Sequence, residues 1–192
     1  MNVINIGYAS TNYYAIGFQE KYLLIDVGLP GTLGKMASQL RKYNIQWSDI
    51  HYLMVTHFHP DHCGIAQEIQ SMGVELIISR TQSDFLESAN ESMKKFSNFK
   101  EIKVEAHNII NEHDQSVFTK KVGIPGYILH TPGHSDDSIS IVIEGLGIFT
   151  GDLPYNPHMS LDTNEKVDQS WSQLRNTNEH KVFPGHGQLL ML

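Results

Sequence analysis

Three histidines and one aspartate lie within six consecutive residues of this chain, in the run His57-Phe58-His59-Pro60-Asp61-His62. Imidazole nitrogens and carboxylate oxygens are ligands that zinc, manganese and iron accept from proteins. Pro60 restricts the residue before it and stiffens the loop, so the alternating side chains can point toward two centres at a small entropic cost. Packing alone gives no reason for such a density of imidazoles. We therefore expect this loop to bind metal.

Three later segments share a second pattern, in which an apolar run is followed by a tight turn containing glycine and then by a residue of metal-ligand type. These segments are Thr131-Pro132-Gly133-His134, Phe149-Thr150-Gly151-Asp152 and Phe183-Pro184-Gly185-His186. Glycine lets the backbone turn sharply and approach an ion closely, while the preceding strand fixes where the turn begins. Together with the first run, these segments supply five histidines and two aspartates, which is enough for two metal ions.

The hydrophobic pattern around these segments predicts strands that alternate with helices. Runs rich in β-branched and aromatic residues predict strands at 3–6, 13–18, 22–27, 50–56 and 74–79. Apolar residues at three-and-four spacing predict helices at 33–43 and 65–72. The run that begins at His57 thus follows a predicted buried strand, and the ends of such strands are where α/β folds place ligands.

The hydrophobic pattern of the second half of the chain also predicts strands and helices. Strands are predicted at 126–131, 138–143, 147–150 and 181–183, and a helix at 164–175. A longer helical pattern covers 81–98, with Phe85, Ala89, Met93 and Phe96 on one stripe. We expect this helix to dock its apolar face on the core, and the alternative is that it covers a pocket. Because no repeat or linker interrupts the chain, we predict one α/β domain over residues 1–192, with mixed sheets.

The run His57-x-His59-x-Asp61-His62, followed by His134, Asp152 and His186 in their turns, resembles the metallo-β-lactamase superfamily over nearly the whole chain. The resemblance implies an αββα sandwich of two mixed β-sheets flanked by helices, with a site for two metal ions at one edge. It assigns His57, His59 and His134 to the first ion, Asp61, His62 and His186 to the second, and Asp152 to both. Asp26, at the end of a predicted strand, matches a position that supports a ligand imidazole through its other nitrogen.

Two divalent ions roughly 3.5 to 4 Å apart lower the pKa of a shared water and polarise an attacked carbonyl or phosphoryl group. We therefore expect a hydrolase that uses a metal-bridging hydroxide to cleave a small ester, thioester, lactone or phosphoester. Zinc is the first choice of ion, with iron and manganese as alternatives. Asp61 is expected to orient the attacking water or to take a proton from it. Tyr155, in the loop after Asp152, is a candidate donor of a hydrogen bond to the developing oxyanion.

Two other functions are compatible with the same residues. Persulfide dioxygenases of this superfamily have these residue types but use one iron, so an iron-dependent oxidoreductase is the main alternative. A metal-binding module without catalysis is the other. Within the superfamily, the β-lactamases have Cys or Ser in place of the bridging aspartate, and this disfavours antibiotic hydrolysis. Hydroxyacylglutathione hydrolases add a helical domain after the last ligand, whereas six residues follow His186, so we do not expect that substrate.

The composition narrows the expected partners. The net charge of −7, from 14 Lys and Arg against 21 Asp and Glu, gives no general attraction to nucleic acid. No apolar stretch approaches the roughly 20 residues that a membrane span requires, and the first ten residues lack the pattern of a secretory signal. We therefore expect a cytoplasmic protein with a small-molecule substrate, and the sequence leaves its oligomeric state open.

The remaining histidines and the single cysteine have no metal-site context. Cys63 excludes an internal disulfide, and we expect it to be a small buried side chain. The other six histidines are expected to lie at the surface or in the core without a functional role: His51, His107, His113, His130, His158 and His180.

Overall fold

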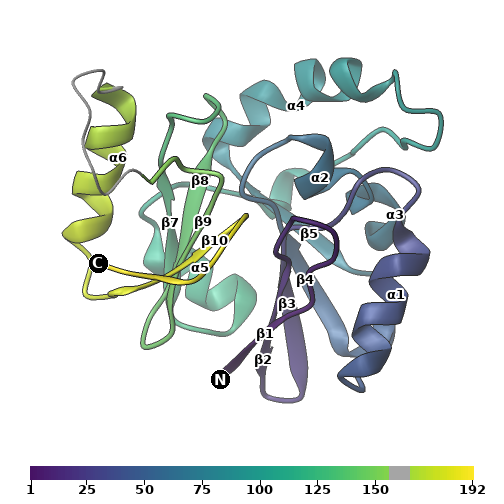
Figure 1. The fold of residues 1–192 in the computed structure, drawn as a ribbon, viewed down its shortest axis with the longest axis horizontal. Coiled ribbons are helices and arrows are strands. Elements are labelled where there is room, and N and C mark those ends of the chain that lie inside the picture. The colour runs from purple at the N-terminus through teal and green to yellow at the C-terminus, as the bar shows by residue number, and fades with distance from the viewer. Residues whose placement is uncertain (156–164) are drawn as a thin grey trace.

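The computed structural model, which describes residues 1–155 and 165–192, contains two β-sheets that pack face to face (Figure 1). The first sheet follows chain order: β1 (Asn2–Asn5), β2 (Tyr14–Phe18), β3 (Lys21–Ile25), β4 (Ile50–Met54), β5 (Glu75–Ser79) and β6 (Ile109–Ile110). Strands β1 to β3 are antiparallel neighbours, and β3 to β6 run parallel. This sheet is therefore mixed.

The second sheet has the order β11-β10-β9-β8-β7. Its strands are β7 (Gly126–His130), β8 (Ile139–Ile143), β9 (Gly147–Gly151), β10 (Lys181–Pro184) and β11 (Leu190–Met191). Strands β9 and β10 pair in parallel, and the other neighbours are antiparallel. Residues 144–146 form the turn between β8 and β9, as the sequence predicts.

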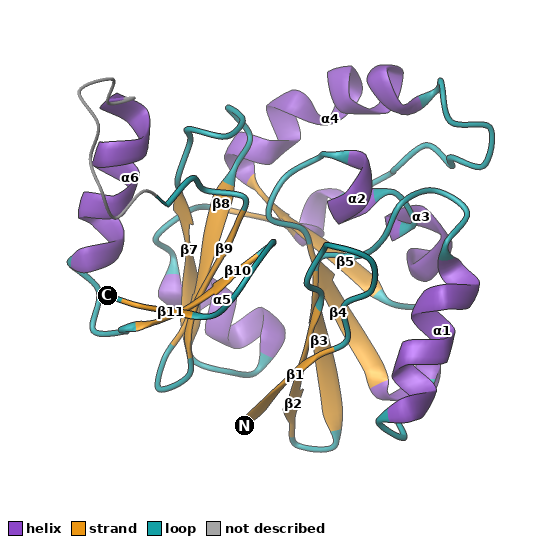
Figure 2. Ribbon diagram, in the orientation of Figure 1, coloured by secondary structure: helices purple, strands orange, loops and turns teal. Residues whose placement is uncertain are grey.

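Helices cover the outer face of each sheet, which gives four layers (Figure 2). The helices of the structure are α1 (Leu33–Lys42), α2 (Pro60–Cys63), α3 (Ala66–Gln70), α4 (Arg80–Met93), α5 (Gln115–Val122) and α6 (Glu165–Arg175), with short 3-10 turns at Trp47–Asp49 and Ala106–Asn108. Of these, α5 packs against the inter-sheet layer rather than against an outer face. Met36 of α1, Ile69 of α3 and Met93 of α4 are buried with the first sheet. Trp171 of α6 is buried with the second. The predicted αββα sandwich is therefore confirmed.

The central strands are buried on both faces, which explains their unbroken apolar sequence. Along β3, Leu24 packs toward the helices, whereas Leu23 and Ile25 pack toward the second sheet. Ile141 and Phe149 of the second sheet belong to the same inter-sheet layer. Because alternate side chains of a strand point to opposite faces, a strand covered on both sides needs apolar residues at nearly every position.

The elements predicted from the sequence are present, with small shifts at their ends. The helix predicted at 81–98 ends at Met93, and its stripe, which continues to Phe96, packs on the core as expected. The helix predicted at 164–175 begins at Glu165 within the described residues, and Asn164 lies outside them. No helix in the two described parts of the chain is both long and apolar enough to cross a membrane.

Helices α2 and α5 and the two-residue strands β6 and β11 are absent from the sequence prediction. Helix α5 buries only Phe118 and Val122, too few residues for a clear periodic pattern. Its ends do carry local signals, because Asp114 Oδ1 accepts a hydrogen bond from the N–H of Val117 (2.9 Å) and Gly123 ends the helix with a φ of 90°. Strands as short as β6 and β11 are defined by their neighbours rather than by their own residues.

Replacing Phe118 with alanine tests how α5 fills the space beside the two sheets. Phe118 is fully buried in the inter-sheet layer, so Phe118→Ala should lower the free energy of unfolding by about 3–5 kcal/mol. The adjacent Val117 is 41% exposed, and Val117→Ala should change that free energy by less than about 0.5 kcal/mol. Urea unfolding followed by circular dichroism measures both variants, and equal losses would contradict the packing.

Candidate metal centre

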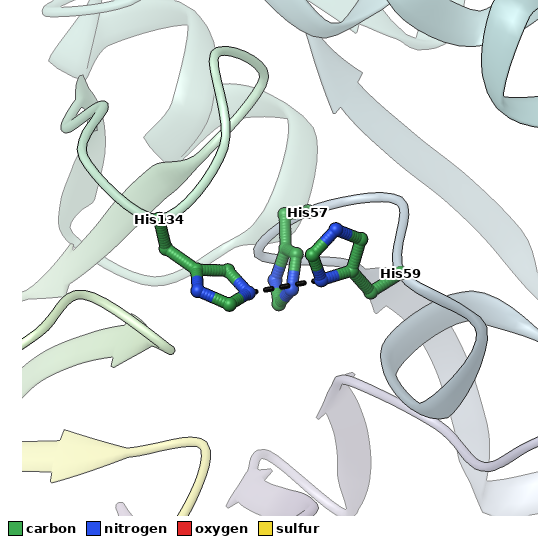
Figure 3. A group of neighbouring side chains, drawn as sticks. All are labelled: His57, His59 and His134. Carbon is green, nitrogen blue, oxygen red and sulfur yellow. Dashed lines mark hydrogen bonds between the residues drawn. The ribbon is translucent and has the colours of Figure 1, made fainter.

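The loops that follow β4, β7, β9 and β10 bring all seven predicted ligand residues to one edge of the sandwich. Figure 3 shows three of them, with His134 from the loop after β7 pointing toward His57 and His59 from the loop after β4. One potential ligand atom from each of these three lies within 4.8 Å of the others, and His134 Nε2 is 2.9 Å from His59 Nδ1. The residues assigned to the first ion therefore form one compact group.

A second compact group consists of Asp61, His62 and His186. Asp61 Oδ2 lies 3.5 Å from His62 Nε2 and 3.4 Å from His186 Nε2. Asp152 lies between the two groups, because its Oδ1 is 3.3 Å from His62 Nε2 and its Oδ2 is 3.5 Å from His134 Nε2 and 3.4 Å from His186 Nε2. Its carboxylate is thus within reach of two ions, as the resemblance implies.

Local structure explains how one loop supplies ligands to both groups. His59 has an extended backbone and is the residue before α2, and Pro60 is the first residue of that helix. Proline at this position has its backbone already set for a helix and lacks only an N–H that would be unpaired. The chain therefore turns at Pro60, which separates His57 and His59 from Asp61 and His62.

Three buried atoms of the candidate ligands form no hydrogen bond among the described residues: His57 Nε2, His62 Nε2 and Asp152 Oδ1, of which the last two lie 3.3 Å apart. A buried polar atom left unpaired costs about 1–3 kcal/mol, so such a cluster needs a partner. Ligands at roughly 2.0–2.1 Å from a tetrahedral zinc ion are about 3.4 Å from one another. The five carboxylate–imidazole distances given above run from 3.3 to 3.5 Å, so these residues fit divalent cations. The 2.9 Å between His59 Nδ1 and His134 Nε2 is shorter, so these two rings would move slightly apart around an ion.

The two buried imidazoles of the site have pKa shifts in opposite directions, and a cation that binds His62 must displace its proton. Burial lowers the pKa of His57 well below its ordinary value, with help from neighbouring imidazoles, and this keeps a lone pair available for metal. Burial also lowers the pKa of His62, but Asp26 and Asp152 outweigh it and raise that pKa to about 10. Positive charge is therefore stabilised where Asp152 and His62 meet.

The carboxylate of Asp26 links the chain segments at this edge of the sandwich. It accepts hydrogen bonds from the N–H of Thr56 (2.6 Å) and the hydroxyl of Thr56 (2.8 Å), and its Oδ2 lies 2.9 Å from His62 Nδ1. The contact with Nδ1 directs His62 Nε2 toward Asp61 and Asp152. The supporting contact expected for Asp26 is therefore present, and its imidazole partner is His62.

Two glycines allow the ligand loops to approach each other. A Cβ on Gly185 would lie 2.5 Å from Asp152 Oδ1 and 2.7 Å from His62 Cε1. Gly151 has a φ of +55°, and a Cβ there would lie 2.3 Å from Thr56 Oγ1. Side chains at either position would displace the ligands, which gives a physical reason for glycine before Asp152 and His186.

Asp137 is a site residue that the sequence analysis missed. Its Oδ2 accepts a hydrogen bond from the N–H of Phe58 at 2.6 Å, and the side chain is almost fully buried. Phe58 lies between His57 and His59, so this contact fixes the backbone of two ligand residues from the opposite half of the chain. The acidic turn 135–138 after His134 was the available sequence signal, but its partner is 79 residues away.

The loop between β1 and β2, together with Tyr14 at the start of β2, also contributes contacts to the site. The hydroxyl of Thr11 donates to Asp61 Oδ2 at 3.2 Å, and His186 Nδ1 lies 2.7 Å from the carbonyl of Ser10. The phenol of Tyr14 donates to the carbonyl of Pro184 at 2.7 Å. These contacts orient Asp61 and His186 from the same side.

The other residues singled out from the sequence lie around this centre or away from it. Tyr155 is 40% exposed, packs edge-on against Trp171, and lines the same cavity as Asp152. Cys63 is fully buried, as predicted. Of the six remaining histidines, five lie outside the candidate metal groups, and His158 falls in the part of the chain that the structure does not describe.

The two mixed sheets lie between helices, and histidines and aspartates cluster at one edge of the sandwich. The fold and the site are therefore those of an αββα protein with a candidate metal centre. A sequence profile described as the Metallo-beta-lactamase superfamily matches residues 6–186. The chain belongs to the metallo-β-lactamase superfamily. This membership confirms the predicted family and agrees with the fold.

Relatives differ in how much of their length they share with this chain. A probable metallo-hydrolase of Methanocaldococcus jannaschii is 28% identical over 95% of this chain and 90% of its own length. A beta-lactamase-like protein 2 homolog of Caenorhabditis elegans is 25% identical over 94% of this chain, which spans 57% of that protein. An atrochrysone carboxyl ACP thioesterase of Aspergillus fumigatus is 27% identical over 74% of this chain, and the match covers 29% of that protein.

Solved structures show the same fold at low sequence identity. The metallo-β-lactamase GOB-18 of Elizabethkingia meningoseptica superposes with a TM-score of 0.73 and 18% identity, over 96% of this chain and 74% of that one. The FEZ-1 metallo-β-lactamase of Legionella gormanii also gives 0.73, with 17% identity, over 96% of this chain and 76% of that one. At these identities the likeness concerns the fold alone.

The variant Asp137→Ala tests whether Asp137 positions the ligand loop. Because the N–H of Phe58 would lose its buried acceptor, we expect zinc affinity to fall by about 10–100-fold and exchange of that amide to accelerate. Competition with a chromophoric chelator and amide hydrogen exchange measure the two effects.

The matched control is Asp136→Ala, which removes an exposed carboxylate paired with Lys166. We expect this control to leave zinc affinity unchanged. If the two variants bind zinc equally tightly, Asp137 has no positioning role.

Proposed function

We propose that this protein is a dinuclear metal-dependent hydrolase that cleaves a small ester, thioester, lactone or phosphoester. The observation that supports it most strongly is the convergence of buried His57, His62 and Asp152 with other side chains of ligand type, where His57 Nε2 has no hydrogen-bond partner among the described residues. Such an arrangement is unfavourable in a protein that has no use for a cation.

The proposed ligands follow from the two groups. His57, His59 and His134 would hold the first ion, and Asp61, His62 and His186 would hold the second. Asp152, which lies near both groups, would contribute to both sites. Zinc suits this set of imidazoles and carboxylates, and iron and manganese accept the same ligands.

Two bound ions would supply Lewis acidity, which lowers the pKa of a shared water and polarises the scissile group. The chain's own contribution begins at Asp61, whose side chain is about one-third exposed and is oriented by the hydroxyl of Thr11. We assign to Asp61 the orientation of the attacking water or the acceptance of its proton. Tyr155 lines the cavity beside Asp152, which supports its role as a hydrogen-bond donor to substrate oxygen.

The relatives support hydrolysis more than they identify a substrate. One is described as a probable metallo-hydrolase and another as a carboxyl ACP thioesterase, and both descriptions concern bonds broken by water. A single domain, a small-molecule substrate and a cytoplasmic location stay predictions from the sequence.

Metal removal and replacement test this function. Protein stripped with a chelator should lose hydrolysis of ester, thioester, lactone and phosphoester probes, and refilling with zinc should restore turnover of at least one class with two ions per chain. His186→Ala should lower kcat/KM by at least about 100-fold because it removes a proposed ligand, whereas His180→Ala should leave it unchanged.

Elemental analysis, alongside these assays, separates the proposed hydrolase from the oxidoreductase alternative. No metal-dependent turnover of any probe would contradict the proposed function. One iron per chain with oxygen uptake on a persulfide would replace it with the dioxygenase chemistry.

A further inference from the structure

A cavity of about 420 Å³ opens beside the candidate metal centre. Its lining includes three candidate metal ligands, His134, Asp152 and His186. The volume lies within the roughly 300–1,000 Å³ typical of small-molecule sites. A substrate that reacts at the metal centre can therefore extend one of its arms into this cavity.

Much of the remaining lining of the cavity is apolar. It consists of Leu153, Pro154, Tyr155, Pro184 and Leu190. The phenol ring of Tyr155 is held against Trp171, whose indole N–H donates to the carbonyl of Pro154 at 2.7 Å. This wall is consequently fixed in place, and a fixed apolar wall favours hydrocarbon over charged groups.

No lysine or arginine of the described residues lines this cavity. The described segments 153–155 and 182–192, which follow Asp152 and include His186, contain none. Lys166 lines a separate hollow of about 260 Å³ that shares only His134 with the cavity, and there it pairs with Asp136. An anionic arm in the cavity would therefore find no cationic side chain among the described lining residues.

We propose that the substrate of this site carries an uncharged hydrocarbon arm, which this cavity binds while the reacting carbonyl faces the ligand residues. The inference rests on the proposed function and narrows it to carboxylic esters, thioesters or lactones with an apolar substituent. Anionic arms such as a carboxylate or a phosphate are disfavoured in this cavity.

Binding of simple carboxylates to the zinc-loaded protein tests the cavity independently of turnover. Acetate, butyrate and hexanoate place the same head group at the metals and differ only in chain length. Their dissociation constants, from calorimetry, should fall by about fourfold for each added methylene. Adipate, which has the length of hexanoate and a second carboxylate, should bind at least about tenfold more weakly than hexanoate. Dissociation constants independent of chain length, or adipate as tight as hexanoate, would overturn the proposal.

A variant that adds a positive charge to the cavity lining tests whether the carboxylates bind in this cavity. Gln188 is exposed and lines the cavity, so Gln188→Arg supplies the missing cation and should shift the adipate-to-hexanoate ratio toward adipate by about tenfold or more. Leu189→Arg adds the same charge one residue away, at an exposed position outside the cavity lining, and should leave the ratio unchanged. Equal ratios in both variants would place the binding site elsewhere.

Turnover of 4-nitrophenyl acetate, butyrate and hexanoate distinguishes a failure of the proposed hydrolase function from a failure of the proposed apolar arm. If none of these esters and no other probe class is hydrolysed while the binding series behaves as expected, the proposed function fails and the apolar cavity stands. If the esters are hydrolysed and hexanoate gains neither in kcat/KM nor in binding, the hydrolase stands and the apolar arm fails.

Discussion

The hydrogen bonds of the Asp26 carboxylate are the interactions on which the candidate site depends most. Its backbone has a φ of 61°, a left-handed conformation that costs on the order of 1 kcal/mol for a residue with a side chain. In return, a side chain that is almost fully buried contacts Thr56 twice and His62 once. Charge-assisted hydrogen bonds of this kind are stronger than neutral ones, so the strained residue is held in place. The end of β3, the ligand loop and α2 are joined through this one group.

The second constraint on the candidate site is that its proposed ligand residues come from loops of both sheets. Hydrogen bonds join the loop after β4 to the second half of the chain, among them those from the N–H of Ile139 to the carbonyl of Thr56 at 2.9 Å and from the N–H of Phe58 to Asp137 at 2.6 Å. On the opposite side, the N–H of Gly185 donates to the carbonyl of Gly151 at 2.7 Å. These bonds fix the distances between ligand atoms before any ion binds, which reduces the cost of organising a metal site.

Sequence reasoning succeeded where the signal was local and failed where it was not. The spacing of His57, His59, Asp61 and His62 shows in six residues, and glycine before His134, Asp152 and His186 marks turns that any reader of the sequence can find. The sandwich followed from alternating strand and helix patterns together with the family resemblance. Asp137 and Thr11 could not be assigned, because their partners are 79 and 50 residues away. Helix α5 had readable ends at Asp114 and Gly123 but too few buried residues to form a pattern. The cavity beside Asp152 depends on segments brought together only by the fold.

The position of bound ions tests the central claim most directly. Crystals grown with zinc, with diffraction measured on both sides of the zinc absorption edge, locate each ion without reference to any reaction. We predict two anomalous peaks at this edge of the sandwich, one among His57, His59 and His134 and the other among Asp61, His62 and His186, with Asp152 touching both. A single peak, or peaks bound to other residues, would contradict the dinuclear site.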